Sequence, residues 1–149
     1  MEKEEYCDVC EKEKPYTRRV GDIFICNDCL KNREHRPTGK HLILEYFGCP
    51  FDKANDYKMM VELIQTAIKE SGATYLKQIG HVFLPQGFTI VALLSESHVS
   101  VHTYPEWGYV AADVFTCGDT VNPYIIHRFL ERALEPKNIN IEEIKRGVN

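Results

Sequence analysis

The sequence predicts an α+β fold in which two helices cover one face of an antiparallel sheet, preceded by a small zinc ribbon. Several short runs alternate apolar and polar residues, the pattern typical of half-buried strands. Two longer segments repeat apolar residues at helical spacing. Four of the six cysteines stand in two Cys-x-x-Cys pairs near the N-terminus, which is a spacing typical of zinc ligands.

Length and composition limit the possible classes of protein. The 149 residues suffice for one ordinary domain and a smaller one, and the apolar fraction of 44% is normal for a globular protein. The net charge of −4 offers no basis for a nucleic-acid or membrane-surface partner. No apolar run approaches the ~20 residues of a membrane span, and the polar start MEKEEYCDVC has no signal-peptide core. We therefore expect a cytoplasmic protein whose cysteines are thiols or metal ligands.

Residues 1–37 form the predicted zinc ribbon. Its expected ligands are the four paired cysteines, Cys7, Cys10, Cys26 and Cys29. Fifteen residues separate the pairs, enough for a short hairpin that folds one pair onto the other and completes a tetrahedral site. The segment has few apolar residues, so bound metal is expected to provide most of its folding energy. A thioredoxin-like redox motif is the weaker alternative, because no βαβ pattern surrounds either pair.

The role predicted for the ribbon is structural, with a partner-binding role as the alternative. Its lysines and arginines are offset by a similar number of acids, which disfavours nucleic-acid binding. His35 could replace a cysteine ligand, but four cysteines already satisfy zinc. Residues 36–39, Arg-Pro-Thr-Gly, are the predicted linker, and the second domain spans residues 38–149.

The second domain is predicted to begin with a strand and a helix. Residues 40–47 alternate as a strand does, and Cys49 after them is expected to be a small buried residue. Residues 56–71 have an apolar stripe at helical spacing, and Gly72 is a natural stop.

Two further strands are predicted at residues 74–83 and 88–94, on either side of a Pro-Gln-Gly turn. The second of them is apolar throughout residues 90–94. Such a run predicts a central strand that is covered on both faces.

A hairpin is predicted next, from a strand that alternates over residues 98–103 and a second one at residues 109–116. This pairing would place Cys117, at the end of the second strand, near the start of the first. A serine, a histidine and a thiol gathered there would form a nucleophile, base and acid set. Simple alternation does not put Ser97 on the face of His102, so we expect the backbone to turn at Ser97.

The C-terminal region is predicted to form a helix and a last strand. Asn122 is a suitable N-cap and Pro123 occupies the first helical position. Pro136 ends the helix, and Ile139 and Ile141 mark a short final strand.

The segment from Ser95 to Asp119 reads SESHVSVHTYPEWGYVAADVFTCGD and carries a resemblance to a known family. It closely resembles the self-processing and catalytic segment of the prokaryotic S-adenosylmethionine decarboxylases, and the likeness extends from about residue 39 to the C-terminus. The resemblance implies that the Ser97 hydroxyl attacks the carbonyl of Glu96. The chain would then split into a β chain, residues 1–96, and an α chain that begins with a pyruvoyl group made from Ser97.

The resemblance also implies roles for single residues. His102 matches the processing base, and Cys117 matches the acid that returns a proton to the substrate carbon. The pyruvoyl group would form a Schiff base with the substrate amine and accept the electrons released by decarboxylation. Phe83 matches an aromatic residue that stacks on adenine, and Glu106 matches an acid that binds the ribose hydroxyls.

The loop after the first hairpin strand departs from the family pattern. It reads Tyr-Pro-Glu-Trp where the family more often has Trp-Pro-Glu-Tyr. The two aromatic residues are exchanged in position but both are present. Aromatic faces suit a sulfonium cation, and this region offers three of them, Tyr104, Trp107 and Tyr109. His98 is equally well explained as a solvated strand histidine.

The predicted function is a pyruvoyl-dependent decarboxylase of S-adenosylmethionine that supplies the aminopropyl donor for spermidine and other polyamines. The family resemblance implies a homodimer of processed protomers. One alternative keeps the self-processing but decarboxylates a free basic amino acid, arginine or ornithine; the presence of Phe83 and Glu106 disfavours it. The other is a zinc-ribbon binding protein that does not process, which the intact set of Glu96, Ser97, His102 and Cys117 disfavours.

Overall fold

The computed structural model describes residues 5–14, 17–31 and 38–147 and divides the chain into two compact units, residues 1–36 and 37–149. The predicted boundary, after residue 37, lies one residue from this division. The predicted linker residues Arg36 and Pro37 and the alternative ligand His35 lie outside the described residues.

The N-terminal unit consists of two short hairpins and one helical turn. Its elements are β1 (Glu5–Cys7), β2 (Lys12–Lys14), β3 (Thr17–Val20), β4 (Ile23–Cys26) and α1 (Asn27–Lys31). β1 pairs with β2 and β3 pairs with β4, both antiparallel. Gly21 supplies the positive φ, +63°, that the tight turn between β3 and β4 requires. The predicted turn and return strand between the cysteine pairs are therefore present.

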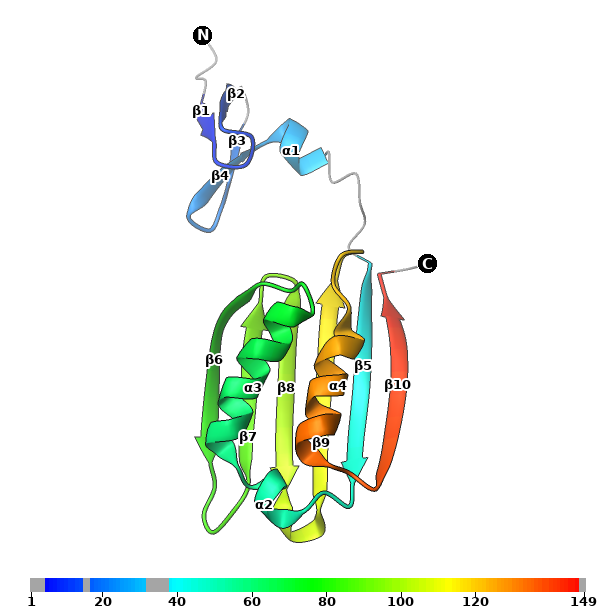
Figure 1. The fold of residues 1–149 in the computed structure, drawn as a ribbon. Coiled ribbons are helices and arrows are strands. Elements are labelled where there is room, and N and C mark those ends of the chain that lie inside the picture. Colours follow the sequence, from blue (N-terminus) through cyan, green and yellow to red (C-terminus); the bar gives the residue numbers. More distant parts are fainter. Residues whose placement is uncertain (1–4, 15–16, 32–37, 148–149) are drawn as a thin grey trace. The chain divides into compact units, whose positions relative to one another are not determined.

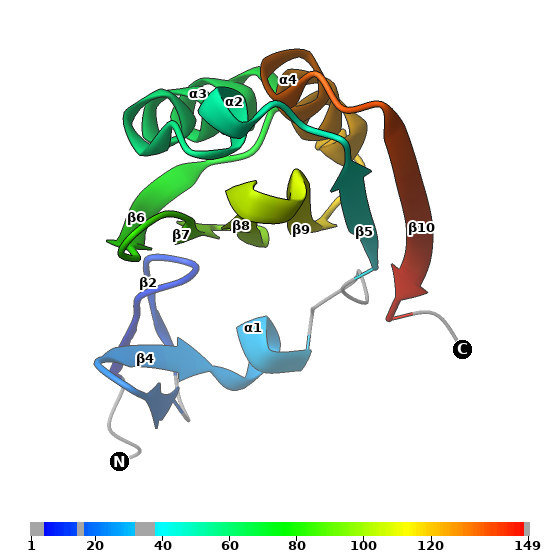
Figure 2. The ribbon, with the colours of Figure 1, turned by 90° about the horizontal axis from the view of Figure 1, so that it is seen from below.

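The C-terminal unit is a two-layer α+β domain. One layer is a six-stranded antiparallel sheet in the order β10-β5-β9-β8-β7-β6. Figure 1 shows α3 lying over β6, β7 and β8, and α4 over β9 and β5. The view along the sheet in Figure 2 places both helices on the same side. The strands are β5 (Gly39–Phe47), β6 (Tyr75–Val82), β7 (Phe88–Leu94), β8 (Ser97–Tyr104), β9 (Tyr109–Cys117) and β10 (Asn138–Arg146); the helical elements are α2 (Phe51–Ala54), α3 (Tyr57–Glu70), the 3-10 turn η1 (Pro105–Trp107) and α4 (Pro123–Leu134). The predicted fold class is confirmed.

Side-chain caps set where the two main helices begin. Asp56 accepts a hydrogen bond from the Met59 N–H, 3.0 Å, at the start of α3. Asn122 accepts one from the Tyr124 N–H, 3.1 Å, at the start of α4. Both helices therefore begin where the sequence predicted. The short helix α2 was not predicted.

The helix-covered face of the sheet forms the core, while the opposite face is open. Alternate residues of β7, from Phe88 to Leu94, are buried, but Val91 and Leu93 on the other face are 39% and 45% exposed. The prediction that this strand is covered on both faces is therefore wrong for the single chain. An apolar run indicates that both faces of the strand are suited to burial. It does not say whether a second layer of the same chain or another protein covers them.

The last strand is longer than predicted. Instead of a short strand around Ile139 and Ile141, β10 spans nine residues that pair with the whole of β5. The pairing carries Arg146 to a position opposite Gly39, at the end of the sheet where Cys117 also pairs with Gly39. A methyl group at Gly39 would lie 2.7 Å from the Phe115 ring and 3.2 Å from the Cys117 sulfur, so this close approach requires glycine.

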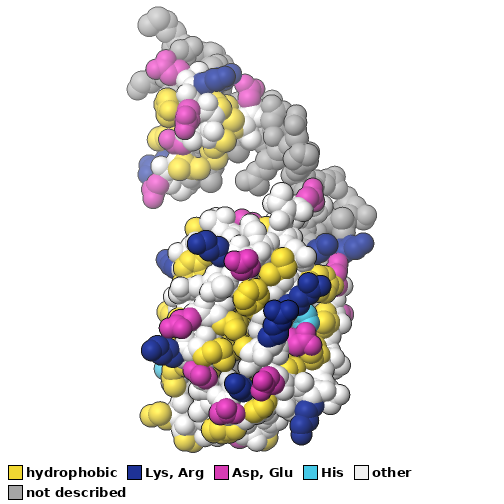
Figure 3. Space-filling view, viewed as in Figure 1, with side chains coloured by type: hydrophobic (Ala, Val, Ile, Leu, Met, Phe, Trp, Pro, Cys, Tyr) yellow, Lys and Arg dark blue, Asp and Glu magenta, His cyan; other side chains and the backbone are white. Residues whose placement is uncertain are grey.

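The helix-covered side of the molecule is mixed in charge. Figure 3 shows lysine and arginine side chains interspersed with aspartate and glutamate over α3 and α4. In the part of the chain that the structure describes, no helix is long and apolar enough to cross a membrane.

A buried polar pair links the sheet to α4. The Tyr46 hydroxyl on β5 lies 2.8 Å from Nδ1 of His127, and the Glu131 carboxylate lies 3.5 Å from its Nε2. Burial lowers the pKa of His127, which outweighs the opposing effect of Glu131. The folded protein therefore binds this proton less readily than an unfolded histidine does.

We expect this histidine to make the domain less stable in mild acid. An unfolded histidine takes up its proton near pH ~6.5, so the free energy of unfolding should fall as the pH drops from 7 to 5.5, by at most about 1.4 kcal/mol per pH unit. Urea unfolding at these two pH values should show a flatter dependence for His127→Gln. His81→Gln, which changes an exposed histidine, is the control. An unchanged slope in His127→Gln would contradict the assignment.

Candidate active site

The β8–β9 hairpin brings the predicted nucleophile and acid together. Ser97 begins β8 and Cys117 ends β9, and the Ser97 Oγ lies 3.8 Å from the Cys117 Sγ. Ser97 has a φ of +139°, a value that side-chain-bearing residues rarely adopt. This agrees with the turn that the sequence required at Ser97.

Hydrogen bonds hold both the carbonyl group and the side chain of Glu96, the residue before Ser97. The Cys117 N–H donates to the Glu96 carbonyl oxygen, with an N···O distance of 3.0 Å. The Glu96 carboxylate accepts bonds from the Thr74 N–H, 2.9 Å, and the Thr74 hydroxyl, 3.1 Å. A backbone N–H directed at a carbonyl oxygen stabilises the negative charge that develops there during nucleophilic attack. The geometry therefore suits attack on this carbonyl.

The other predicted site residues lie at the opposite end of β8. The predicted base His102 and the predicted substrate-binding residues all line one cavity of about 300 Å³. Its lining residues are Phe83, Gln86, Thr89, His102, Thr103, Tyr104 and Glu106. His102 Nδ1 is hydrogen-bonded to the Thr89 hydroxyl at 3.0 Å, and the Tyr104 ring stacks on both Trp107 and Tyr109. The structure thus gathers the predicted substrate-binding residues and His102 in one place.

The candidate site is consequently divided into two halves. His102 stands five residues beyond Ser97 on the same strand, which corresponds to about 16 Å at the rise of an extended chain. Within one chain, the expectation that the serine, the histidine and the thiol meet is therefore not met. The physical reason is that a continuous strand cannot fold His102 back onto its own first residue.

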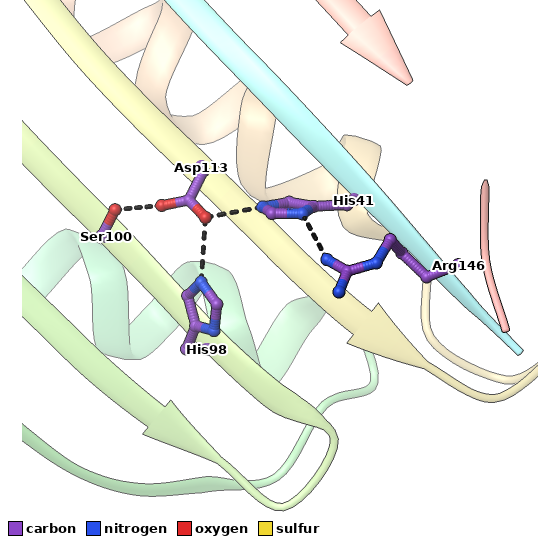
Figure 4. Close-up of polar contacts among 5 residues, drawn as sticks. All are labelled: His41, His98, Ser100, Asp113 and Arg146. Atoms are coloured by element: carbon purple, nitrogen blue, oxygen red, sulfur yellow. Dashed lines mark hydrogen bonds and ion pairs between the residues drawn. The ribbon is translucent and has the colours of Figure 1, made fainter. Parts of the chain in front are cut away.

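A hydrogen-bonded cluster beside Ser97 was missed by the sequence analysis (Figure 4). Asp113 on β9 accepts bonds from three side chains. His41 on β5 binds it through Nε2 at 2.6 Å, His98 on β8 through Nε2 at 2.8 Å, and the Ser100 hydroxyl donates to its other oxygen. On the far side of His41, the Arg146 Nη1 lies 3.2 Å from Nδ1. The one signal in the sequence was a charged residue within the otherwise apolar run of β9.

The three donors keep Asp113 ionised. Partial burial disfavours its carboxylate form, but the hydrogen bonds from Ser100, His41 and His98 outweigh that effect and hold the pKa below its usual value. The cluster therefore places a fixed negative charge on the open face of the sheet, four residues before Cys117 on the same strand.

The four paired cysteines of the N-terminal unit converge. Their sulfur atoms all lie within 4.8 Å of one another, and Cys10 and Cys26 are separated by 4.0 Å. Four sulfurs bound to one zinc ion at 2.3 Å lie about 3.8 Å apart, so the observed spacing fits that ion. Burial disfavours the Cys7 thiolate, but bonds from the backbone N–H groups of Cys10, Cys26 and Val9 lower the pKa of Cys7 to about 6. These four residues could hold a metal.

Comparison with known proteins gives a consistent result. Residues 40–147 match the family model described as S-adenosylmethionine decarboxylase. The chain is 46% identical over 113 residues to a protein of Methanococcus maripaludis named S-adenosylmethionine decarboxylase proenzyme, covering 76% of this chain and 93% of that protein. A protein of the same name from Moorella thermoacetica is 42% identical, with 76% and 90% covered.

A solved structure agrees with these relatives. The crystal structure of the adenosylmethionine decarboxylase from Aquifex aeolicus superposes with a TM-score of 0.71 at 33% identity, over 77% of this chain and 95% of that one. Together with the hairpin geometry at Ser97, the comparisons show that the chain belongs to the S-adenosylmethionine decarboxylase family.

Proposed function

We propose that this protein is a self-processing decarboxylase of S-adenosylmethionine, which supplies the aminopropyl donor for spermidine and other polyamines. The observation that carries the proposal is the arrangement at the Glu96–Ser97 bond. A hydroxyl and a thiol meet there at 3.8 Å, and the carbonyl to be attacked already accepts a hydrogen bond from the Cys117 N–H.

Self-cleavage follows from this arrangement. The Ser97 oxygen attacks the Glu96 carbonyl carbon, the C–N bond breaks, and Glu96 is left joined to Ser97 through an ester. A base then removes the proton from the Ser97 α-carbon, and the main-chain carboxylate of Glu96 leaves, which converts Ser97 to dehydroalanine. Water hydrolyses the imine form of this residue to a pyruvoyl group and releases ammonia. The uncommon φ at Ser97 strains the backbone, and cleavage of the chain releases this strain.

The residues around Ser97 fit a decarboxylase that uses this group. The pyruvoyl group supplies an electron sink for the electrons that decarboxylation releases. Cys117 is placed to give its thiol proton to the substrate carbon. In the cavity at the other end of β8, Phe83 offers a face for adenine, Glu106 a carboxylate for the ribose hydroxyls, and Tyr104 an aromatic face for the sulfonium.

We propose that a second copy of the chain completes the site. The open face of the sheet exposes apolar side chains, with Ile79 76% exposed and Val91 39% exposed beside a hollow of about 360 Å³. Sheets stack about 10 Å apart. In such a stack, a two-fold axis can lie between the two sheets, perpendicular to the strands. The strands of the two copies then run in opposite directions, so the Ser97 end of one copy lies over the His102 end of the other. Each homodimer would then contain two complete sites.

We also propose that the N-terminal unit is a structural zinc ribbon. Four converging cysteines with no open coordination position are typical of structural rather than catalytic zinc. A site of four thiolates is maintained in a reducing compartment, and we therefore place the protein in the cytoplasm.

The self-cleavage predicts two chains in the purified protein. Intact mass spectrometry under denaturing conditions should find residues 1–96 and a second fragment that begins with a pyruvoyl group at position 97. Ser97→Ala should give one uncut chain. If this variant still splits, Ser97 is not the source of the group. Carbon dioxide release should be fastest from S-adenosylmethionine; faster release from arginine or ornithine would contradict the proposed substrate.

The shared site predicts complementation between two inactive chains. Ser97→Ala lacks the nucleophile, and His102→Gln lacks the base. When the two are co-expressed, the mixed dimer pairs an intact Ser97 with an intact His102, so part of the His102→Gln chain should be cut. Differently tagged chains allow the products to be assigned on a gel. Absence of cutting in the mixture, together with full cutting in the wild type, would show that the site lies within one chain.

The zinc site predicts one bound zinc per chain, measured by elemental mass spectrometry. Cys26→Ser should lose the metal, because three thiolates no longer close the tetrahedral site. Cys49→Ser is the matched control, since Cys49 is a buried cysteine of the C-terminal unit. Self-cleavage should persist in Cys26→Ser. Equal zinc content in the two variants would overturn the assignment.

A further inference from the structure

The cluster around Asp113 contains one histidine that is bonded through both ring nitrogens and one that is bonded through a single ring nitrogen. The guanidinium of Arg146 has only donors, so the contact at 3.2 Å assigns the acceptor role to the His41 Nδ1. The His41 Nε2 then donates to Asp113. The position of Arg146 is fixed in turn by the Phe115 ring, with 4.8 Å between the guanidinium carbon and the ring centroid.

Hydrogen bonding explains this cluster better than a bound metal does. Two histidines and an aspartate could ligate an ion, since their ligand atoms lie within 4.8 Å of one another. Ligands on one zinc, however, lie about 3.3 Å apart, whereas His41 and Asp113 are separated by 2.6 Å. The short separation and the Arg146 donor both indicate a shared proton.

His98 is the member of the cluster that can exchange a proton. Its Nε2 donates to Asp113, and in the described part of the chain no side chain or backbone group is bonded to its Nδ1. The side chain is 37% exposed on the open face of the sheet. An ionised carboxylate behind an imidazole stabilises the imidazolium form, as in an aspartate–histidine pair of a hydrolase.

His98 lies beside the thiol that the proposed reaction uses. It pairs across the hairpin with Phe115, and the two rings meet edge to face at 5.9 Å. Cys117 is two residues further along the same face of β9, so it is the diagonal neighbour of His98. Diagonal neighbours in an antiparallel pair are about 7–8 Å apart between their Cα atoms, so proton transfer between the two side chains would require a bridging water molecule.

We propose that His98, held by Asp113, is the residue that returns a proton to Cys117 after each turnover. When Cys117 protonates the substrate carbon, its S–H bond breaks, a C–H bond forms, and a thiolate remains. The imidazolium of His98 then gives its Nδ1 proton through the water to the thiolate, and bulk water restores the imidazolium. His98 acts through Cys117 and is not itself a catalytic residue. This inference rests on the proposed decarboxylase function.

The groups that face His98 are few. From β9 they are Asp113 and Cys117, and from β5 His41, which Arg146 of β10 contacts in turn. On β7 the residue opposite His98 is Leu93, which has no ionisable group. Asp113 and Cys117 are therefore the groups through which His98 would act.

Comparison of the first turnover with later ones tests the proposal. The first turnover uses the thiol proton that Cys117 already carries in the proposed reaction, so His98→Gln should release the first equivalent of carbon dioxide within about threefold of the wild-type rate. Later turnovers should slow about tenfold or more, the lower part of the range for general acid catalysis. The glutamine can still donate to Asp113, and added imidazole should restore later turnovers. Asp52→Asn, an exposed change on α2, is the control. An equal loss in the first and later turnovers, or no loss in either, would overturn the proposal.

A second readout does not depend on turnover. In the uncut Ser97→Ala chain, the rate of Cys117 alkylation by iodoacetamide can be followed against pH by peptide mass spectrometry. Coupling to His98 predicts that His98→Gln or Asp113→Asn changes this profile. Identical profiles in all variants would overturn the proposal. Failure of the wild type to decarboxylate S-adenosylmethionine would instead contradict the proposed function. Because alkylation does not require turnover, it tests the role of His98 independently of that result.

Discussion

The pairing of β8 with β9 is the constraint on which the candidate site depends. Its register places Ser97 opposite Thr116, next to Cys117, and directs the Cys117 N–H to the Glu96 carbonyl. These contacts involve backbone groups at one end of a six-stranded sheet, where neighbouring strands leave little freedom to move. A shift of one residue would turn every side chain of β8 to the other face and separate the serine from the thiol.

The sheet meets two opposing demands at its open face. The face must carry polar groups for chemistry, and polar groups without partners would be costly where the proposed homodimer excludes water. The cluster around Asp113 resolves this conflict, because its carboxylate accepts bonds from three side chains on two neighbouring strands and is held ionised. At the other end of β8, stacked aromatic rings and a single carboxylate, Glu106, provide a surface suited to a cationic nucleoside.

The division of the site along β8 follows from the same sheet. A strand is extended, so residues at its two ends serve separate halves of the site, and the exposed apolar side chains of the open face lie on the neighbouring strands β7 and β6. In the proposed homodimer, this separation becomes an advantage. Each copy contributes the end that the other lacks, and the apolar surface is buried in the process. Assembly would then be a condition of self-cleavage rather than an accessory to it.

The sequence by itself determined the elements and much of the chemistry. The alternation in residues 98–116, the caps Asp56 and Asn122, and the cysteine spacing each depend on neighbours along the chain, and these predictions agree with the structure within one or two residues. Only the tertiary structure decided what lies across the strands. It separated His102 from Ser97, left one face of β7 open, and joined His41, Asp113 and Arg146 into one cluster. These three residues are far apart in the sequence, and strand order, which local periodicity does not encode, is what brings them together.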